Sequence, residues 1–259
     1  MTVAGRASLR EHLVNRADGG KSLIAYLTIG DPVDDFIHCA QSILSAGATT
    51  LELGMPLESP AEGEVLLASH ARARAGGIDE AQALALFAGV HEENPEIPLI
   101  AVNHWPALGN SGALASFVAQ AAVAGASAVL IVGLPFGQLV PFRSACDAAG
   151  VESVLSCFPD TPSRMRALIY RQCTGCVYIA RSRGASGGEG AVSVDELCQK
   201  MRSETDVPLI VGFGIEDNAA VTRVCRAGAH AAVVGSALVG RIALDPSAGA
   251  EFVTMLLSG

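Results

Sequence analysis

Apolar residues follow two alternating spacings along the chain. Short apolar runs rich in Val, Ile, Leu and Ala alternate with longer stretches in which apolar residues recur every three or four positions. The first pattern predicts buried β-strands and the second predicts amphipathic helices. The expected strands are residues 23–29, 50–55, 99–104, 128–132, 153–157, 176–180, 209–213 and 231–234. The expected helices include residues 34–45, 79–91, 113–123, 140–149, 163–171, 194–202 and 219–226.

The strand–helix unit repeats through the whole chain. Ala-Gly-Ala stands directly before an expected strand at residues 46–48, 124–126 and 227–229, where glycine can end the preceding helix. Eight such units in 259 residues, with no linker between them, predict an α/β protein with one (β/α)₈ TIM-barrel domain over residues 1–259. An extra N-terminal helix at residues 7–16 is expected to cover the bottom of the barrel. An open doubly wound sheet is the alternative, but it fits the unit count less well.

Composition excludes several classes of partner. Half of the residues are apolar, the net charge is −9, and the chain has only two lysines. Nucleic acid is therefore not expected as a partner, because binding its backbone needs clustered basic residues. No run approaches the ~18 apolar residues of a membrane span, and residues 1–15 lack the apolar core of a signal peptide. Seven scattered cysteines suit reduced thiols, so a cytoplasmic location is expected.

Glycine-bearing turns follow the last two expected strands, at residues 212–215 and 235–237. In TIM barrels the loops after strands seven and eight often bind a phosphate group. Glycine lets main-chain N–H groups approach the oxygens, and a helix N-terminus adds positive charge. A third glycine-rich loop, residues 182–188, could add the Ser186 hydroxyl. Tight turns without a ligand would also use these glycines, but together the turns favour a small phosphorylated substrate.

One carboxylate is expected inside the barrel. Side chains alternate along a strand, so Leu51 and Leu53 should face the helices while Glu52 faces inward. Burial disfavours the charged form of a carboxylate, which suits acid–base catalysis near neutral pH, although a structural glutamate is equally compatible. The same alternation turns Tyr178 inward on strand six, where it could orient Glu52, line a pocket or simply fill the core. Tyr26 and Thr28 face inward on strand one.

Other barrel chemistries lack their residues. A Schiff-base aldolase needs an internal lysine, but Lys21 precedes the first strand and Lys200 lies on an outer helix. A metal aldolase needs a cluster of ligands, yet His104 alone among the histidines falls at a strand end. Cys173 and Cys176 form a single CxxC with no second pair, so we expect no zinc or redox site there. Cofactor-free acid–base catalysis remains, and no cofactor is expected.

The chain resembles the tryptophan synthase alpha subunit family. Matching motifs run in order at residues 26–32, 51–56, 186–187, 212–215 and 235–237. The resemblance implies a lyase that cleaves indole-3-glycerol phosphate to indole and glyceraldehyde 3-phosphate. Protonation of indole C3 and removal of the proton from the neighbouring side-chain hydroxyl drive this retro-aldol cleavage. A tryptophan synthase beta subunit is the implied protein partner.

The resemblance also assigns roles to individual residues. Glu52 matches the family's catalytic glutamate, and Tyr178 matches the tyrosine beside it. Glu62 is the best match to a second catalytic carboxylate, an aspartate that bonds the indole nitrogen. The substrate-binding positions are Tyr26 and Phe213 beside the indole, Gly184, Gly214, Gly235 and Ser236 around the phosphate, and Thr28 and Ser186 in the adjoining motifs.

The loop that carries Glu62 departs from the family pattern. Residues 56–64 are one residue shorter than usual, and Glu62 stands where the family has aspartate. Residues 103–106 and 133–135, in loops that contact the beta subunit in the family, differ as well. Three functions stay open at this point: an ordinary alpha subunit, a stand-alone lyase of a specialised pathway with the same or a related phosphorylated substrate, and a catalytically silent regulatory subunit.

Overall fold

Eight parallel strands form a closed barrel in the computed structural model, which describes residues 7–16, 21–58, 60, 63–180 and 193–258. Each strand pairs with the next in the sequence, and β8 pairs with β1. The predicted TIM barrel is therefore confirmed. The strands are β1 (Leu23–Thr28), β2 (Thr50–Gly54), β3 (Leu99–His104), β4 (Ala128–Val132), β5 (Glu152–Cys157), β6 (Val177–Ile179), β7 (Leu209–Val211) and β8 (Ala231–Val234).

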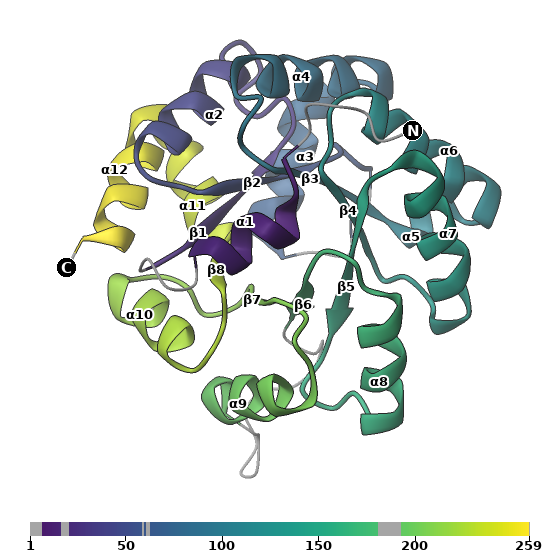
Figure 1. The fold of residues 1–259 in the computed structure, drawn as a ribbon. Coiled ribbons are helices and arrows are strands. Elements are labelled where there is room, and N and C mark those ends of the chain that lie inside the picture. Colours follow the sequence, from purple (N-terminus) through teal and green to yellow (C-terminus); the bar gives the residue numbers. More distant parts are fainter. Residues whose placement is uncertain (1–6, 17–20, 59, 61–62, 181–192, 259) are drawn as a thin grey trace.

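Helices surround the barrel and connect its strands (Figure 1). Each helix expected between strands is present, with ends that differ by a few residues. The helices are α1 (Leu9–Arg16), α2 (Phe36–Ser45), α3 (Glu64–Ala75), α4 (Glu80–Glu93), α5 (Trp105–Leu108), α6 (Ser111–Val123), η1 (Phe136–Gln138), α7 (Leu139–Ala149), α8 (Ser163–Gln172), α9 (Val194–Glu204), α10 (Asn218–Arg226), α11 (Ser236–Ile242) and α12 (Pro246–Leu257).

Alternation along the strands separates two cores. Leu51 and Leu53 pack in the layer between the strands and the helices, whereas Ile24, Ile100 and Ile210 pack inside the barrel. Glu52 lies between Leu51 and Leu53 and is in register with residues of β1 and β3. Because successive side chains point to opposite faces, Glu52 faces the interior, as the sequence predicts.

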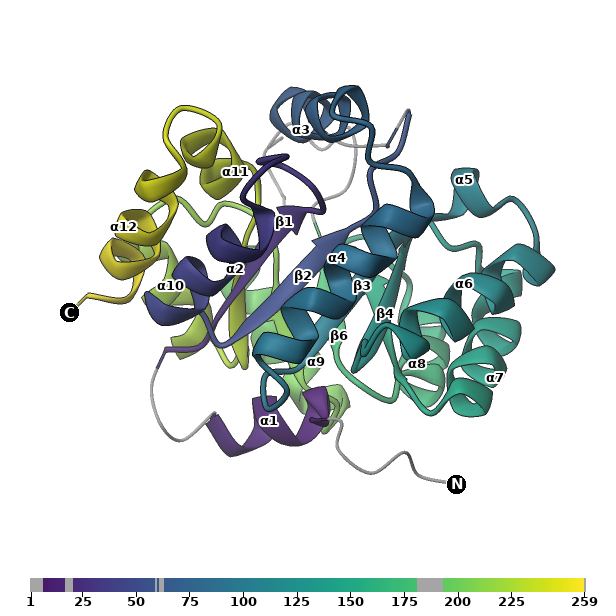
Figure 2. The ribbon, with the colours of Figure 1, turned by 90° about the horizontal axis from the view of Figure 1, so that it is seen from above.

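Helix α1 closes the amino-terminal end of the barrel. Its Leu9 and Leu13 are completely buried and belong to the interior core. Glu152, the first residue of β5, holds the start of this helix: it accepts hydrogen bonds from the Ser8 hydroxyl at 2.6 Å and from the Arg10 N–H at 2.9 Å. Helix α3 lies at the opposite end of the barrel from α1 (Figure 2). The predicted bottom helix is therefore confirmed, and the carboxyl-terminal end is left for a site.

Helices α3, α5, α11 and α12 are additions to the elements that the sequence predicted. In α3, alanines alternate with arginines and a histidine, which hides the apolar period that identifies a helix.

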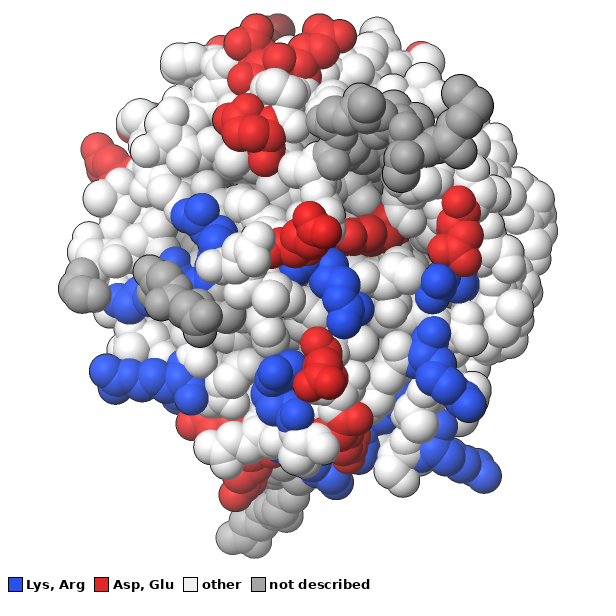
Figure 3. Space-filling model, in the orientation of Figure 1, with Lys and Arg blue, Asp and Glu red and all other residues white. Residues whose placement is uncertain are grey.

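Acidic and basic side chains both occur on the face that α1 covers, with several acidic groups at its upper edge (Figure 3). None of the helices within the described ranges has the length and apolar character to cross a membrane.

Candidate active site

A cavity of about 630 Å³ opens at the carboxyl-terminal ends of the strands. Ligand cavities in enzymes commonly have volumes of about 300–1,000 Å³ and combine apolar walls with a few polar groups. Here the apolar wall includes Leu66, Val102, Leu130, Val132, Ile215 and Val233. The polar side chains that line it are those of Tyr26, Glu52, Ser156, Tyr178, Glu216 and Ser236. The composition suits a flat apolar ring with a polar tail.

Glu52 is the carboxylate on the interior wall of this cavity. The residue is 2% exposed, and its Cα pairs in register with those of Tyr26 and Ile100. Burial beside apolar side chains is unfavourable for a carboxylate, so retaining one here needs a structural or a catalytic reason. Its position on the cavity wall makes Glu52 accessible to a bound ligand. The geometry therefore allows proton transfer to or from that ligand.

Tyr178 reaches the same cavity from β6, and Gly212 makes room for it. A Cβ atom built on Gly212 would lie 2.6 Å from Tyr178 Cε1 and would overlap the hydroxyl end of the ring still more closely. No residue other than glycine fits at position 212 unless the Tyr178 ring moves. Gly212 was expected to contribute to the phosphate turn, and the structure shows that it also accommodates Tyr178.

The side chain of Tyr26, on β1, spans the cavity wall between Gly235, after β8, and Gly54, in β2. Its Cβ lies 3.7 Å from the Cβ position of Gly235, and its Cζ lies 2.8 Å from that of Gly54. The Tyr26 hydroxyl is within 3.3 Å of His70 Nε2, a helix α3 residue. Glycine at position 54 is thus required by the tyrosine ring beside it. Both inward-facing tyrosines expected from the sequence line the cavity.

The two glycine turns after β7 and β8 lie together at the cavity mouth. Gly214 has a φ of +67°, a conformation that favours glycine, and Gly235 is the residue before helix α11. Phe213, Gly214, Gly235 and Ser236 all line the cavity. The first N–H groups of a helix have no acceptor within it, so the start of α11 offers donors to an anion. Phosphate sites at this place recur in TIM barrels.

The remaining expected site residues have different outcomes. Glu62, Gly184 and Ser186 lie outside the described residues. Thr28 faces inward on β1, but it is not among the cavity-lining residues. Its hydroxyl instead lies 2.6 Å from the Ser69 hydroxyl, because α3 packs over the end of β1. A direct contact between Thr28 and substrate therefore stays a prediction.

The two lysines and the CxxC cysteines do not line the cavity. Lys21 precedes β1 and Lys200 lies on α9, away from the cavity lining. Burial raises the pKa of the Cys173 thiol to about 12 and that of Cys176 well above its usual value, and both cysteines are free. Such thiols are unreactive. Within the described part of the chain, no three His, Cys, Asp or Glu side chains are placed to share a metal ion.

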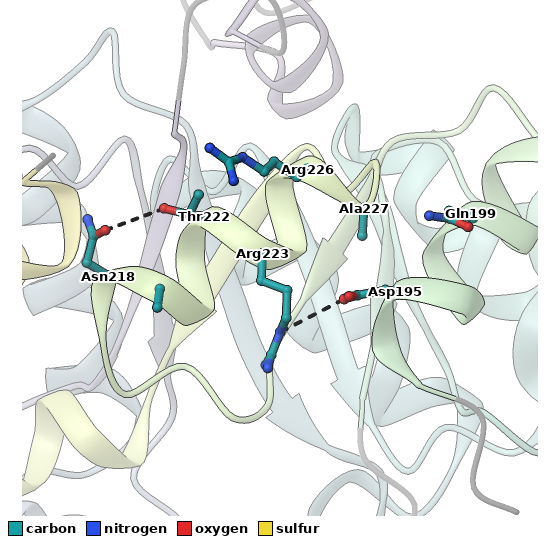
Figure 4. A pocket seen from close by; sticks show the side chains of 8 residues that line it. Asp195, Gln199, Asn218, Thr222, Arg223, Arg226 and Ala227 are labelled. Atoms are coloured by element: carbon teal, nitrogen blue, oxygen red, sulfur yellow. Dashed lines mark hydrogen bonds and ion pairs between the residues drawn. The ribbon is translucent and has the colours of Figure 1, made fainter.

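A second hollow, of about 470 Å³, lies on the outside of the barrel between α9 and α10. Figure 4 shows Arg223 pointing toward Asp195 across this groove. The two side chains form an ion pair with nitrogen and oxygen 3.9 Å apart, and the Thr222 hydroxyl donates to the Asn218 side-chain oxygen. The charge of Arg223 is thus balanced by the neighbouring helix. The barrel cavity is the better candidate site, because there the polar groups converge within an apolar enclosure.

Sequence reasoning missed three residues around the cavity. Ser156 and Glu216 line it, and His70 lies directly behind Tyr26. Alternation on β5 could have placed Ser156, since it is two residues from the interior residue Val154. His70 carried no such signal, because its contact with Tyr26 depends on how α3 packs against the barrel.

Comparisons with known proteins agree with this geometry. The family model described as tryptophan synthase alpha chain matches residues 13–255. The tryptophan synthase alpha chain of Thioalkalivibrio sulfidiphilus is 35% identical over 94% of this chain and 93% of its own length. The alpha chain structure from Legionella pneumophila has a TM-score of 0.83 at 25% identity, covering 96% and 95% of the two chains. A structure of the tryptophan synthase a2b2 complex from Pyrococcus furiosus contains a chain with a TM-score of 0.80 at 27% identity, covering 92% of this chain and 98% of that one. With a family match over almost its full length, this chain belongs to the tryptophan synthase alpha chain family.

Proposed function

We propose that this protein is a lyase that cleaves indole-3-glycerol phosphate to indole and glyceraldehyde 3-phosphate. The observation that carries the proposal is the joint placement of a buried carboxylate, Glu52, and the glycine turns at Gly214 and Gly235 in one cavity. The apolar wall accommodates an indole ring, and the N–H groups at the start of α11 accommodate a phosphate. Family membership supports the same activity.

Glu52 moves the protons in the proposed reaction. In its protonated form it donates a proton to indole C3, and the resulting carboxylate accepts the proton of the side-chain hydroxyl next to the ring. The carbon–carbon bond then breaks, its electrons return to the indole ring, and the hydroxyl carbon becomes the aldehyde carbon of the triose phosphate. Protons are conserved over the cycle, and the chemistry needs no electron acceptor. Tyr178, whose ring lies against Gly212 on the same cavity, supports and orients the reacting groups.

Glu62 is proposed as the second carboxylate, which bonds the indole nitrogen. Its neighbour Gly63 lines the cavity, which supports a role for this part of the chain. The longer glutamate side chain compensates for the loss of one residue from the loop. A Glu62→Ala variant tests this: we expect weaker substrate binding and slower cleavage. Unchanged kinetics would refute the compensation and leave the fold and the role of Glu52 unaffected.

A tryptophan synthase beta subunit is the proposed partner. The similar chain from Pyrococcus furiosus occurs in an a2b2 complex, which supports the proposal. Stimulation of cleavage by an added beta subunit is the expected result. High turnover by the isolated chain, without stimulation, would instead favour a stand-alone lyase.

The seven free cysteines support the expected cytoplasmic location, because unpaired thiols persist in a reducing compartment.

The test of the main proposal is steady-state cleavage of indole-3-glycerol phosphate by the wild type and by Glu52→Gln. Removing an essential proton-transfer group lowers rates by about 10²–10⁴-fold. Glu251→Gln, an exposed change on the outer helix α12, is the matched control and should retain full turnover. Wild-type turnover by Glu52→Gln would refute the assignment of Glu52. Absence of cleavage by the wild type, with and without a beta subunit, would favour the silent regulatory subunit.

A further inference from the structure

His70 lies behind the cavity wall and contacts residues on or next to β1, β2 and β3. The residue belongs to α3, is 1% exposed, and does not itself line the cavity. Its Nδ1 accepts a hydrogen bond from the Leu57 N–H at 3.0 Å, just after β2. Its Nε2 lies 3.3 Å from the Tyr26 hydroxyl on β1, and its ring meets that of His104, the last residue of β3, edge to face at a centroid distance of 6.5 Å.

These contacts fix the tautomer of the ring. An N–H group can only donate, so the Leu57 N–H requires a lone pair on His70 Nδ1. In a neutral imidazole the proton then resides on Nε2, and this N–H donates to the oxygen of Tyr26. A charged imidazolium would place two donors against each other at Leu57. The hydrogen bond from Leu57 therefore requires an unprotonated Nδ1 and one defined orientation of the ring.

Tyr26 is the group through which His70 reaches the cavity. At one end, the Tyr26 Cβ lies 3.7 Å from the position that a Cβ on Gly235 would occupy, beside the proposed phosphate site; at the other, its ring fills the space that glycine leaves at position 54. His70 bonds the hydroxyl at this second end. A tyrosine held at both ends presents its ring to the cavity in one position, at low entropic cost to a ligand that packs against it.

We propose that His70 is a positioning residue for substrate: its Nε2–H locks the ring of Tyr26 against the indole side of the cavity, while its Nδ1 fixes the start of the loop after β2. The proposal rests on the proposed function for the identity of the substrate. It assigns a functional role to a buried histidine on α3 that does not touch the substrate itself.

The kinetic test distinguishes the roles of the two ring nitrogens of His70. Asparagine can replace Nδ1 as an acceptor for Leu57 but cannot reach Tyr26, whereas glutamine can donate toward Tyr26. We expect His70→Asn to raise KM for indole-3-glycerol phosphate about two- to tenfold, the effect of one hydrogen bond, with little change in kcat. His70→Gln should keep KM closer to that of the wild type. In a Tyr26→Phe background, His70→Asn should have no further effect.

Equal and independent losses from His70→Asn in both backgrounds would overturn the proposal, as would a wild-type KM in His70→Asn. His38→Asn, an exposed change on the outer helix α2, is the matched control. Thermal unfolding of each variant identifies any that fail to fold. If His70→Asn does not fold, His70→Gln alone and combined with Tyr26→Phe carries the comparison.

A second measurement does not need substrate. Nitrogen-15 NMR of the full chain distinguishes protonated from unprotonated ring nitrogens, and His70→Gln identifies the signals of this ring. We expect an unprotonated Nδ1 and a protonated Nε2 whose shift changes in Tyr26→Phe. A protonated Nδ1, or an Nε2 signal indifferent to Tyr26→Phe, would overturn the role of His70 even if cleavage is confirmed. Expected NMR results with no cleavage by the wild type would refute the proposed function instead.

Discussion

Replacing Gly212 with alanine would place a methyl group where the ring of Tyr178 lies. The added Cβ would be 2.6 Å from Tyr178 Cε1, whereas carbon atoms in contact are normally about 3.5–4.0 Å apart. The backbone cannot yield easily, because the Gly212 N–H bonds to the Ile179 carbonyl at 3.1 Å. The ring of Tyr178 must therefore move by about 1 Å or more to restore a normal contact.

That displacement sets the expected magnitudes. Overpacking of this kind costs about 1–3 kcal/mol of folding free energy, so the midpoint of urea unfolding should fall. Tyr178 is proposed to orient the reacting groups, and a misplacement of about 1 Å in such a group can lower the rate by about 100-fold, so kcat/KM for indole-3-glycerol phosphate should fall by one to two orders of magnitude. Steady-state cleavage and urea titrations of the same preparation measure both effects.

Gly137→Ala is the matched control for Gly212→Ala. Its Cβ would meet no atom within 4 Å, and the backbone there is not in a positive-φ conformation. Stability and turnover should therefore remain close to those of the wild type. A double variant tests the cause: once Tyr178 has been changed to alanine, Gly212→Ala should have almost no further effect on rate. If Gly212→Ala behaves like the control, Gly212 does not constrain Tyr178 and the argument is wrong.

Two further predictions concern stability. Glu152→Ala should lower the free energy of unfolding by about 1–2 kcal/mol, because the Ser8 hydroxyl and the Arg10 N–H lose their half-buried acceptor, and KM should not change; an unchanged urea midpoint would show that α1 is held in another way. Burial lowers the pKa of His230 to about 4, so the unfolded chain binds more protons between pH 6.5 and 4. Stability should therefore fall as the pH drops through this window, by about 1–2 kcal/mol once solvent screening of the half-exposed ring is taken into account. His230→Asn, which can still accept the Leu209 N–H, should flatten that dependence in unfolding measurements across pH; an unaltered slope would contradict the assignment.

Much of the site can be predicted because a strand has a period of two. That period alone places the side chains of Glu52, Tyr26 and Tyr178 in the barrel interior, and the position of the glycine turns after β7 and β8 follows from the order of the strands. The three side chains line the cavity, together with Gly214 and Gly235 of the two turns. Local periodicity and chain order are sufficient here because both are properties of neighbouring residues.

Side-chain contacts between elements that are far apart in the sequence could not be predicted from it. The pairing of Thr28 with Ser69, and of Tyr26 with His70, depends on how α3 packs over the ends of the first strands. The space at Gly54 and Gly212 is likewise defined by tyrosines on neighbouring strands, 28 and 34 residues away in sequence. Glycine in these places predicts a turn or a close approach, but not the partner that approaches.

Helix α1 has a consequence for turnover, because its Leu9 and Leu13 fill the amino-terminal end of the barrel. Within the described residues this end of the barrel is filled, so substrate and both products would pass through the carboxyl-terminal end, where the cavity opens. The proposed phosphate turns, with Gly214 and Gly235, lie at this same opening. Added glyceraldehyde 3-phosphate, which would occupy these turns, should therefore slow the cleavage of indole-3-glycerol phosphate.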